Sequence, residues 1–136
     1  MPPKILIVDD DPLMHRLYQH HLERAGFQLL SATSGRQALE VAAQELPQLI
    51  FMDVMMEEMT GLVALRELKK MTAMKDVPII VITAIVGALA ATKKEAETAG
   101  AAGFLTKPLS PSKLIAEIQR FIPSADGASP PAQPGM

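Results

Sequence analysis

Charged residues stand at three points where a short apolar run of the chain ends. Aspartates occupy positions 9–11 directly after the run 5–8, Asp53 follows 49–52, and Lys107 follows the short run that ends at position 106. Carboxylates about 4 Å apart repel each other by roughly 4 kcal/mol at an effective dielectric near 20. Such a cluster therefore needs a cation, a proton or a lysine beside it. The chain supplies the lysine, and its oxygen ligands suit a metal ion such as Mg²⁺.

The apolar runs before these charges are short enough to be buried strands rather than helices. Strands are predicted at residues 5–8, 28–32, 49–53, 78–83 and 104–106. Helical patterns cover about 12–25, the stretch between Ser34 and Pro47, a stretch led by Gly61, about 88–99, and a stretch from Ser110 to Ile122. Five alternating strand-helix units with apolar strands predict an α/β fold with a parallel sheet covered on both faces. In such folds ligands bind beyond the carboxyl ends of the strands, where the charged residues should meet.

Composition limits the number of domains and the classes of function. The 136 residues, 49% of them hydrophobic, fit one domain with a real core, which we place at 4–122. From 123 to 136 the sequence is rich in Pro, Ala and Gly without periodicity, as expected of a disordered tail or linker. A net charge of -2 provides no field that would attract nucleic acid or an anionic membrane.

Cysteine content and hydropathy predict the compartment. The chain has no cysteine, which excludes disulfides, thiolate catalysis and cysteine-bound zinc, and which fits a reducing compartment. No apolar stretch reaches the roughly 18 residues that a membrane span requires. We therefore expect a soluble, cytoplasmic protein that binds neither nucleic acid nor membrane directly.

Four motifs together resemble the receiver domain of two-component response regulators. They are Ile-Leu-Ile-Val-Asp-Asp-Asp-Pro at 5–12, Phe-Met-Asp at 51–53, Ile-Thr-Ala at 82–84 and Gly-Phe-Leu-Thr-Lys-Pro at 103–108. The resemblance covers about 4–122. It implies a flavodoxin-like, doubly wound (βα)5 fold with strand order 2-1-3-4-5. It also implies a domain that takes a phosphoryl group from a histidine kinase or a phosphotransfer histidine.

The same resemblance assigns roles to individual residues. Asp53 corresponds to the phosphoacceptor and Lys107 to the lysine that pairs with a phosphoryl oxygen. Asp10 corresponds to a direct Mg²⁺ ligand and Asp9 to a ligand acting through water. The acceptor itself and the backbone carbonyl of Met55 would complete the protein's share of the metal site, with Mn²⁺ as an alternative ion.

The resemblance further implies a conformational switch. Thr83 would donate its hydroxyl to the phosphoryl group, and Phe104 would turn inward as Thr83 moves. The Lys107-Pro108 peptide is expected to be cis. In the family the resulting surface change is read around the fourth helix, the fifth strand and the fifth helix. The expected output is control of a partner protein, with a homodimer formed on phosphorylation as a further expectation. Enzymatic activity would be limited to the domain's own aspartyl phosphorylation and dephosphorylation.

Two departures from the family pattern lie near the acceptor. Glu57 stands four residues past Asp53, where proline is frequent. Met55 and Ile85 are apolar at the positions two past the acceptor and two past Thr83, so neither offers a polar group to orient a hydrolytic water. We therefore expect a long-lived phosphoryl state.

Other residues fit ordinary structural roles. The histidines at 15, 20 and 21 are expected to be solvated residues of the first helix, with a metal or phosphohistidine role much less favoured. The methionines around Asp53 are expected to pack in the core and loop. One aspartate of the 9–11 cluster would be accounted for as a helix N-cap, but three are not.

Three alternative functions remain open. The spacing of Asp9 and Asp11 suits a phosphatase of the haloacid-dehalogenase type, although Leu13 replaces the usual Thr or Val. A flavin-binding, flavodoxin-like protein would share the fold, but residues 31–35 form a poor phosphate cradle. The third alternative is an adaptor that works without phosphorylation.

Overall fold

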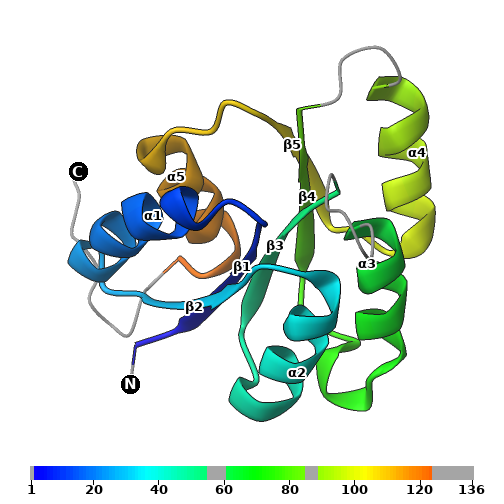
Figure 1. Ribbon diagram of the computed structural model, residues 1–136, viewed down its shortest axis with the longest axis horizontal. Coiled ribbons are helices and arrows are strands. Elements are labelled where there is room, and N and C mark those ends of the chain that lie inside the picture. The colour runs from blue at the N-terminus through cyan, green and yellow to red at the C-terminus, as the bar shows by residue number, and fades with distance from the viewer. Residues whose placement is uncertain (1, 55–60, 85–88, 124–136) are drawn as a thin grey trace.

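The computed structural model describes residues 2–54, 61–84 and 89–123, and within them strands and helices alternate (Figure 1). The strands are β1 (Lys4–Val8), β2 (Gln28–Ala32), β3 (Leu49–Asp53), β4 (Ile79–Thr83) and β5 (Gly103–Thr106). The helices are α1 (Pro12–Arg24), α2 (Gly35–Glu45), α3 (Gly61–Lys70), α4 (Leu89–Ala99) and α5 (Pro111–Phe121), with the short 3-10 helix η1 (Thr72–Met74) before β4. The predicted alternation is confirmed; η1 was not predicted.

All five strands pair in parallel in the order β2-β1-β3-β4-β5, which confirms the predicted α/β fold and strand order. The register aligns the carboxyl ends of neighbouring strands. Val8 lies opposite Met52, and Thr83 lies opposite Thr106. The residues that end or follow β1, β3, β4 and β5 therefore come to one edge of the sheet.

Helices cover both faces of the sheet and create two hydrophobic cores. Side chains of a strand point alternately to its two faces. Ile5 and Ile7 belong to the core under α1 and α5, whereas Leu6 and Val8 belong to the core under α2, α3 and α4 (Figure 1). Burying each of these aliphatic side chains contributes about 1.5–3 kcal/mol. The two cores fix the strand ends in place from both sides.

Polar side chains cap three of the helices as their sequences predict. The side-chain oxygen of Asp11 accepts from the Leu13 amide at 3.0 Å, so one member of the aspartate cluster is the N-cap of α1. Ser110 caps α5 in the same way, accepting from the amide of Lys113 at 3.1 Å. Ser34 accepts from the amide of Gln37 at 3.1 Å, as in a capping box. The returning bond differs from the usual pattern, because Gln37 accepts from the amide of Thr33 at 2.6 Å rather than from the cap residue itself.

The regular elements run from Lys4 to Phe121. The expected tail at 123–136 lies outside the described residues, apart from Pro123. Within the described ranges, none of the helices has both the length and the apolar composition to span a membrane.

Candidate functional site

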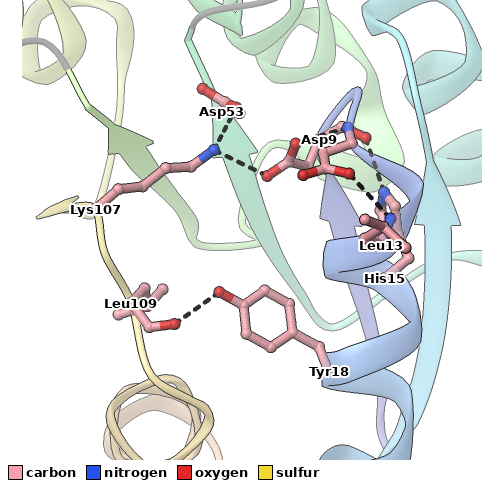
Figure 2. Close-up of polar contacts among 8 residues, drawn as sticks. Asp9, Leu13, His15, Tyr18, Asp53, Lys107 and Leu109 are labelled. Atoms are coloured by element: carbon pink, nitrogen blue, oxygen red, sulfur yellow. Dashed lines mark hydrogen bonds and ion pairs between the residues drawn. The ribbon is translucent and has the colours of Figure 1, made fainter.

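The predicted acidic residues and lysine meet at the carboxyl edge of the sheet (Figure 2). Asp9 follows β1 directly, Asp53 is the last residue of β3, and Lys107 follows β5. Both aspartates are buried, with 4% and 3% of their surface exposed. Their charges are therefore poorly screened by solvent and must be balanced by groups nearby.

Lys107 bridges the two buried carboxylates. Its Nζ lies 2.9 Å from Asp53 Oδ2 and 3.1 Å from Asp9 Oδ2. Partial burial alone would lower the pKa of Lys107, but hydrogen bonds to Asp53 and Asp9, together with their negative charges, raise it above its ordinary value. The lysine is thus held as a cation between two carboxylates that arise from different strands (Figure 2).

Asp10 adds a third carboxylate to this pair. One oxygen from each of Asp9, Asp10 and Asp53 lies within 4.8 Å of the others, and Asp10 is exposed. Asp9 also accepts the amide of Asp11 at 2.9 Å, which fixes its side chain. The three carboxylates can carry three negative charges, and Lys107 supplies one positive charge. The donor set therefore fits Mg²⁺, which takes oxygen ligands and is held by one or two carboxylates together with water and phosphate oxygens.

The two predicted switch residues lie on the neighbouring strands. Thr83 is fully buried at the end of β4. Its carbonyl accepts from the backbone amide of Lys107 at 2.9 Å, so β4 holds the first residue of the segment after β5. Phe104 on β5 pairs with Val81 and packs, partly buried, against the core under α2, α3 and α4. Met55, Glu57 and Ile85 lie outside the described residues.

A match to a known family accompanies this geometry. A sequence model of the response regulator receiver domain matches residues 5–119. The chain belongs to the response regulator receiver-domain family. Members of this family are signalling proteins of two-component systems.

Curated relatives of this receiver domain fall into two lengths. The polar-differentiation response regulator DivK of Brucella anthropi is 28% identical over 92% of this chain and all of the relative. The alkaline phosphatase synthesis transcriptional regulatory protein PhoP of Bacillus subtilis is 32% identical over 98% of this chain but only 54% of the relative. The probable transcriptional regulator ycf27 of Pyropia yezoensis is 37% identical over 90% of this chain and 49% of the relative. This chain thus spans about half the length of PhoP and of ycf27, and the full length of DivK.

Solved receiver structures share the fold. Chemotaxis protein CheY4 of Vibrio cholerae superposes with a TM-score of 0.83 at 31% identity, covering 89% of this chain and 99% of CheY4. The receiver domain of sensor histidine kinase PA1611 from Pseudomonas aeruginosa, solved with a magnesium ion coordinated in its active-site cleft, gives 0.79 at 29% identity and covers 91% and 100% of the two chains.

Gly61, at the start of α3, contacts the backbone of the proposed phosphoacceptor. A Cβ at this position would lie 2.2 Å from the carbonyl oxygen of Asp53 and 2.8 Å from Val54 Cα. Only glycine allows α3 to approach β3 so closely. The sequence indicated Gly61 as a helix start but gave no sign of this contact.

Two buried polar residues of α1 were not predicted as part of the site. His15 was expected to be solvated, which is wrong: it is 7% exposed, and its Nε2 lies 2.8 Å from the backbone oxygen of Asp9. Tyr18 donates its hydroxyl to the backbone oxygen of Leu109 at 2.8 Å. The predicted cis peptide between Lys107 and Pro108 is confirmed.

A groove of about 740 Å³ opens beside the site, between α1 and the segment that follows β5. Met14 and Leu17 line its α1 side, and Pro108 and Leu109 line the other. Leu17 is 44% exposed, and the neighbouring Leu13 is 66% exposed. An apolar surface of this receiver domain therefore borders the cluster of charges.

Proposed function

We propose that this receiver domain accepts a phosphoryl group on Asp53 from a histidine kinase or a phosphotransfer histidine, and that the acquired charge switches its surface. The observation that carries the proposal is the position of Lys107 Nζ between Asp53 and Asp9 in a cluster of three carboxylates. Membership of the receiver family supports the same function.

The chemistry requires one bond to form and one to break. A carboxylate oxygen of Asp53 attacks the phosphorus of a phosphohistidine, the phosphorus–nitrogen bond breaks, and its electron pair stays on the imidazole nitrogen of the donor. Such transfer depends on positioning and charge stabilisation more than on covalent help. Lys107 already contacts the acceptor carboxylate, so it is close enough to pair with an oxygen of the incoming group.

A metal ion is part of this proposal. Asp10 would bind Mg²⁺ directly and Asp9 through water, with Asp53 and the backbone carbonyl of Met55 as further ligands. When bound, Mg²⁺ or Mn²⁺ would neutralise charge on the phosphoryl oxygens. The magnesium ion in the active-site cleft of the PA1611 receiver domain, a relative with the same fold, supports this part of the proposal.

The output would follow from the new charge. A phosphoryl group adds about -1.5 to -2 charges, which need additional hydrogen-bond donors. Thr83 would supply its hydroxyl, and Phe104 would turn inward into the space that opens. The change would appear on the surface formed by α4, β5 and α5, where a downstream protein or a second phosphorylated copy would bind.

The phosphodonor would dock on the groove beside the site. Met14 and Leu17 give the groove an apolar lining, and Leu13 is exposed nearby. This surface suits the apolar surface of a helical partner protein. Lys107 lines the same groove, so a donor histidine placed there would be near the acceptor.

The proposal also covers the extent of the domain, its compartment and its catalysis. We place the receiver domain at 4–122 and a tail or linker at 123–136, in the cytoplasm, with no direct contact to nucleic acid or membrane. Catalysis would be confined to the domain's own phosphorylation and dephosphorylation.

The decisive experiment uses acetyl phosphate with Mg²⁺ and follows the intact mass of the protein. Wild type should gain one phosphoryl group, and Asp53→Asn or chelation of the metal should prevent the gain. Asp11→Asn is the matched control, because Asp11 caps α1 and lies outside the three-carboxylate cluster; it should be phosphorylated like wild type. An adduct on Asp9 would favour the phosphatase alternative. No adduct on wild type would favour the adaptor.

A further inference from the structure

One face of α1 holds two buried polar side chains that reach the backbone of the site. His15 and Tyr18 are three residues apart, so they lie on the same side of the helix. Both are more than nine-tenths buried. Each forms its hydrogen bond with a backbone carbonyl rather than with another side chain, and the two carbonyls belong to the two segments that carry Asp9 and Lys107 (Figure 2).

The contact of His15 fixes the end of β1. A carbonyl oxygen can only accept, so His15 Nε2 carries the hydrogen and donates it to Asp9 at 2.8 Å. The other ring nitrogen, Nδ1, is buried and finds no hydrogen-bond partner among the described residues. A buried polar atom without a partner is unfavourable, and an apolar side chain would avoid it. The one hydrogen bond that the ring does make is directed at the backbone of Asp9.

The contact of Tyr18 fixes the segment after β5. Its hydroxyl donates to Leu109, which is 91 residues away in the chain and two residues after Lys107. Burial, together with the negative charge of Asp9, raises the pKa of Tyr18, so the hydroxyl remains a donor at neutral pH. The backbone amide of Lys107 is itself bound to Thr83 at 2.9 Å. The segment 107–109 is therefore held by β4 at one end and by α1 at the other.

We propose that His15 and Tyr18 are positioning residues for phosphoryl transfer, through which α1 sets the place of Asp9 and of Lys107 relative to Asp53. This inference rests on the proposed function of the site. It assigns separate effects to the two residues. Tyr18 acts through the lysine that would pair with the transferred group. His15 acts through Asp9, one of the three carboxylates proposed to hold Mg²⁺.

The test compares Tyr18→Phe and His15→Leu with Leu22→Val. Leu22 is fully buried on α1 in the same core as Tyr18, but its aliphatic side chain takes no part in the hydrogen bonds that hold Asp9 and Leu109. Its truncation is a control for loss of stability alone. Phosphorylation by acetyl phosphate is measured at saturating Mg²⁺, the Mg²⁺ affinity is measured separately by calorimetry, and thermal unfolding verifies that each variant is folded at the assay temperature.

Tyr18→Phe should lower the phosphorylation rate at saturating Mg²⁺ by about ten-fold and leave the Mg²⁺ affinity unchanged, as expected for a group that supports a site residue indirectly. His15→Leu should weaken Mg²⁺ binding by a similar factor of about ten. His15→Gln, whose amide can donate in place of Nε2, should restore part of that affinity. Leu22→Val should change neither quantity.

The inference is overturned if Tyr18→Phe and His15→Leu both behave like Leu22→Val, or if each variant changes rate and Mg²⁺ affinity in the same proportion. Failure of the proposed function gives a different result. In that case wild type itself would not be phosphorylated, while the effect of His15 on Mg²⁺ binding would still be measurable. If wild type were phosphorylated and the variants matched it, only the positioning role would be lost.

Discussion

Asp10→Asn is expected to stabilise the metal-free protein and to abolish its stabilisation by Mg²⁺. Asp10 is the exposed member of three carboxylates whose ligand oxygens lie within 4.8 Å of one another. Replacing its carboxylate by an amide of the same shape removes the repulsion from Asp9 and Asp53. It also removes a charged ligand that we propose for Mg²⁺. Relative to wild type, the substitution should therefore raise the stability of the protein without metal and lower it when Mg²⁺ is present.

The geometry gives the size of the effect. Two unit charges 4.8 Å apart repel by about 3.5 kcal/mol at a dielectric of 20 and by about 0.9 kcal/mol in bulk water. The lower figure suits an exposed side chain. Asp10 takes part in two such pairs, and its attraction to Lys107 offsets part of their sum. We expect a net gain of about 1 kcal/mol without metal, or about 3–5 °C in the unfolding midpoint for a domain of this size.

The assay is thermal unfolding with chelator and with excess Mg²⁺. At a concentration one hundred times its dissociation constant, a ligand of the native state stabilises by about 2.7 kcal/mol. Wild type should gain about this much, so the order of stability of wild type and Asp10→Asn should reverse when Mg²⁺ is added. Asp11→Asn is the matched control. Asparagine caps a helix as well as aspartate does, so this variant should follow wild type in both conditions.

Two results would refute the reasoning. If Asp10→Asn were less stable than wild type in chelator, repulsion among the three carboxylates would not govern the stability of the metal-free protein. If the variant gained as much stability from Mg²⁺ as wild type does, Asp10 would not be a ligand.

Three further predictions concern other parts of the site. Gly61→Ala should destabilise the protein by about 3 kcal/mol, because its Cβ would lie 2.2 Å from the oxygen of Asp53; an unchanged urea midpoint would contradict this close packing. Since Asp53 and Asp9 raise the pKa of Lys107, its stabilising charge is fully present below the ordinary lysine pKa of about 10.4 and is lost as the pH rises through the folded-state pKa. The stability difference between wild type and Lys107→Met, measured by urea unfolding, should therefore shrink above that pH, and a constant difference would argue against the ion pair. Met55→Asn should hydrolyse its aspartyl phosphate faster than wild type in a decay assay. An equal or slower rate of hydrolysis would contradict the expectation of a long-lived phosphoryl state.

The fold could be predicted because apolar residues follow different patterns along strands and along helices. Short, largely apolar runs indicated buried strands, and the helical repeats between them indicated crossovers, which together require a parallel sheet. The boundaries differ by about one residue. The fourth strand was predicted from Pro78 but begins at Ile79, since proline has no amide hydrogen to donate to the ladder. The 3-10 helix Thr72–Met74 was missed, because three residues are too few to show a period.

The charged part of the site could be predicted for a related reason. Once the strands are parallel, the residues after their carboxyl ends must be neighbours, and this rule brings Asp9, Asp53 and Lys107 together before any distance is known. The supporting contacts obey no such rule. The hydrogen bond of Tyr18 to Leu109 depends on how α1 lies against a segment 91 residues away. Without that information, His15 on a helix of mixed polarity is indistinguishable from a solvated histidine.

The small contribution of β2 to the proposed site has an evolutionary consequence. In the described part of the chain, β1, β3, β4 and β5 each end in or lead to a side chain of the proposed site, whereas β2 adds only the backbone oxygen of Ala32, which accepts from the amide of Asp9 at 3.0 Å. A backbone bond of this kind survives most changes of side chain. Under the proposed function, selection for phosphoryl transfer would act on the side chains of four strands, while β2 would be selected for packing and for this backbone bond. We expect substitutions among descendants of this gene to accumulate in β2, where sequence can drift without altering the chemistry.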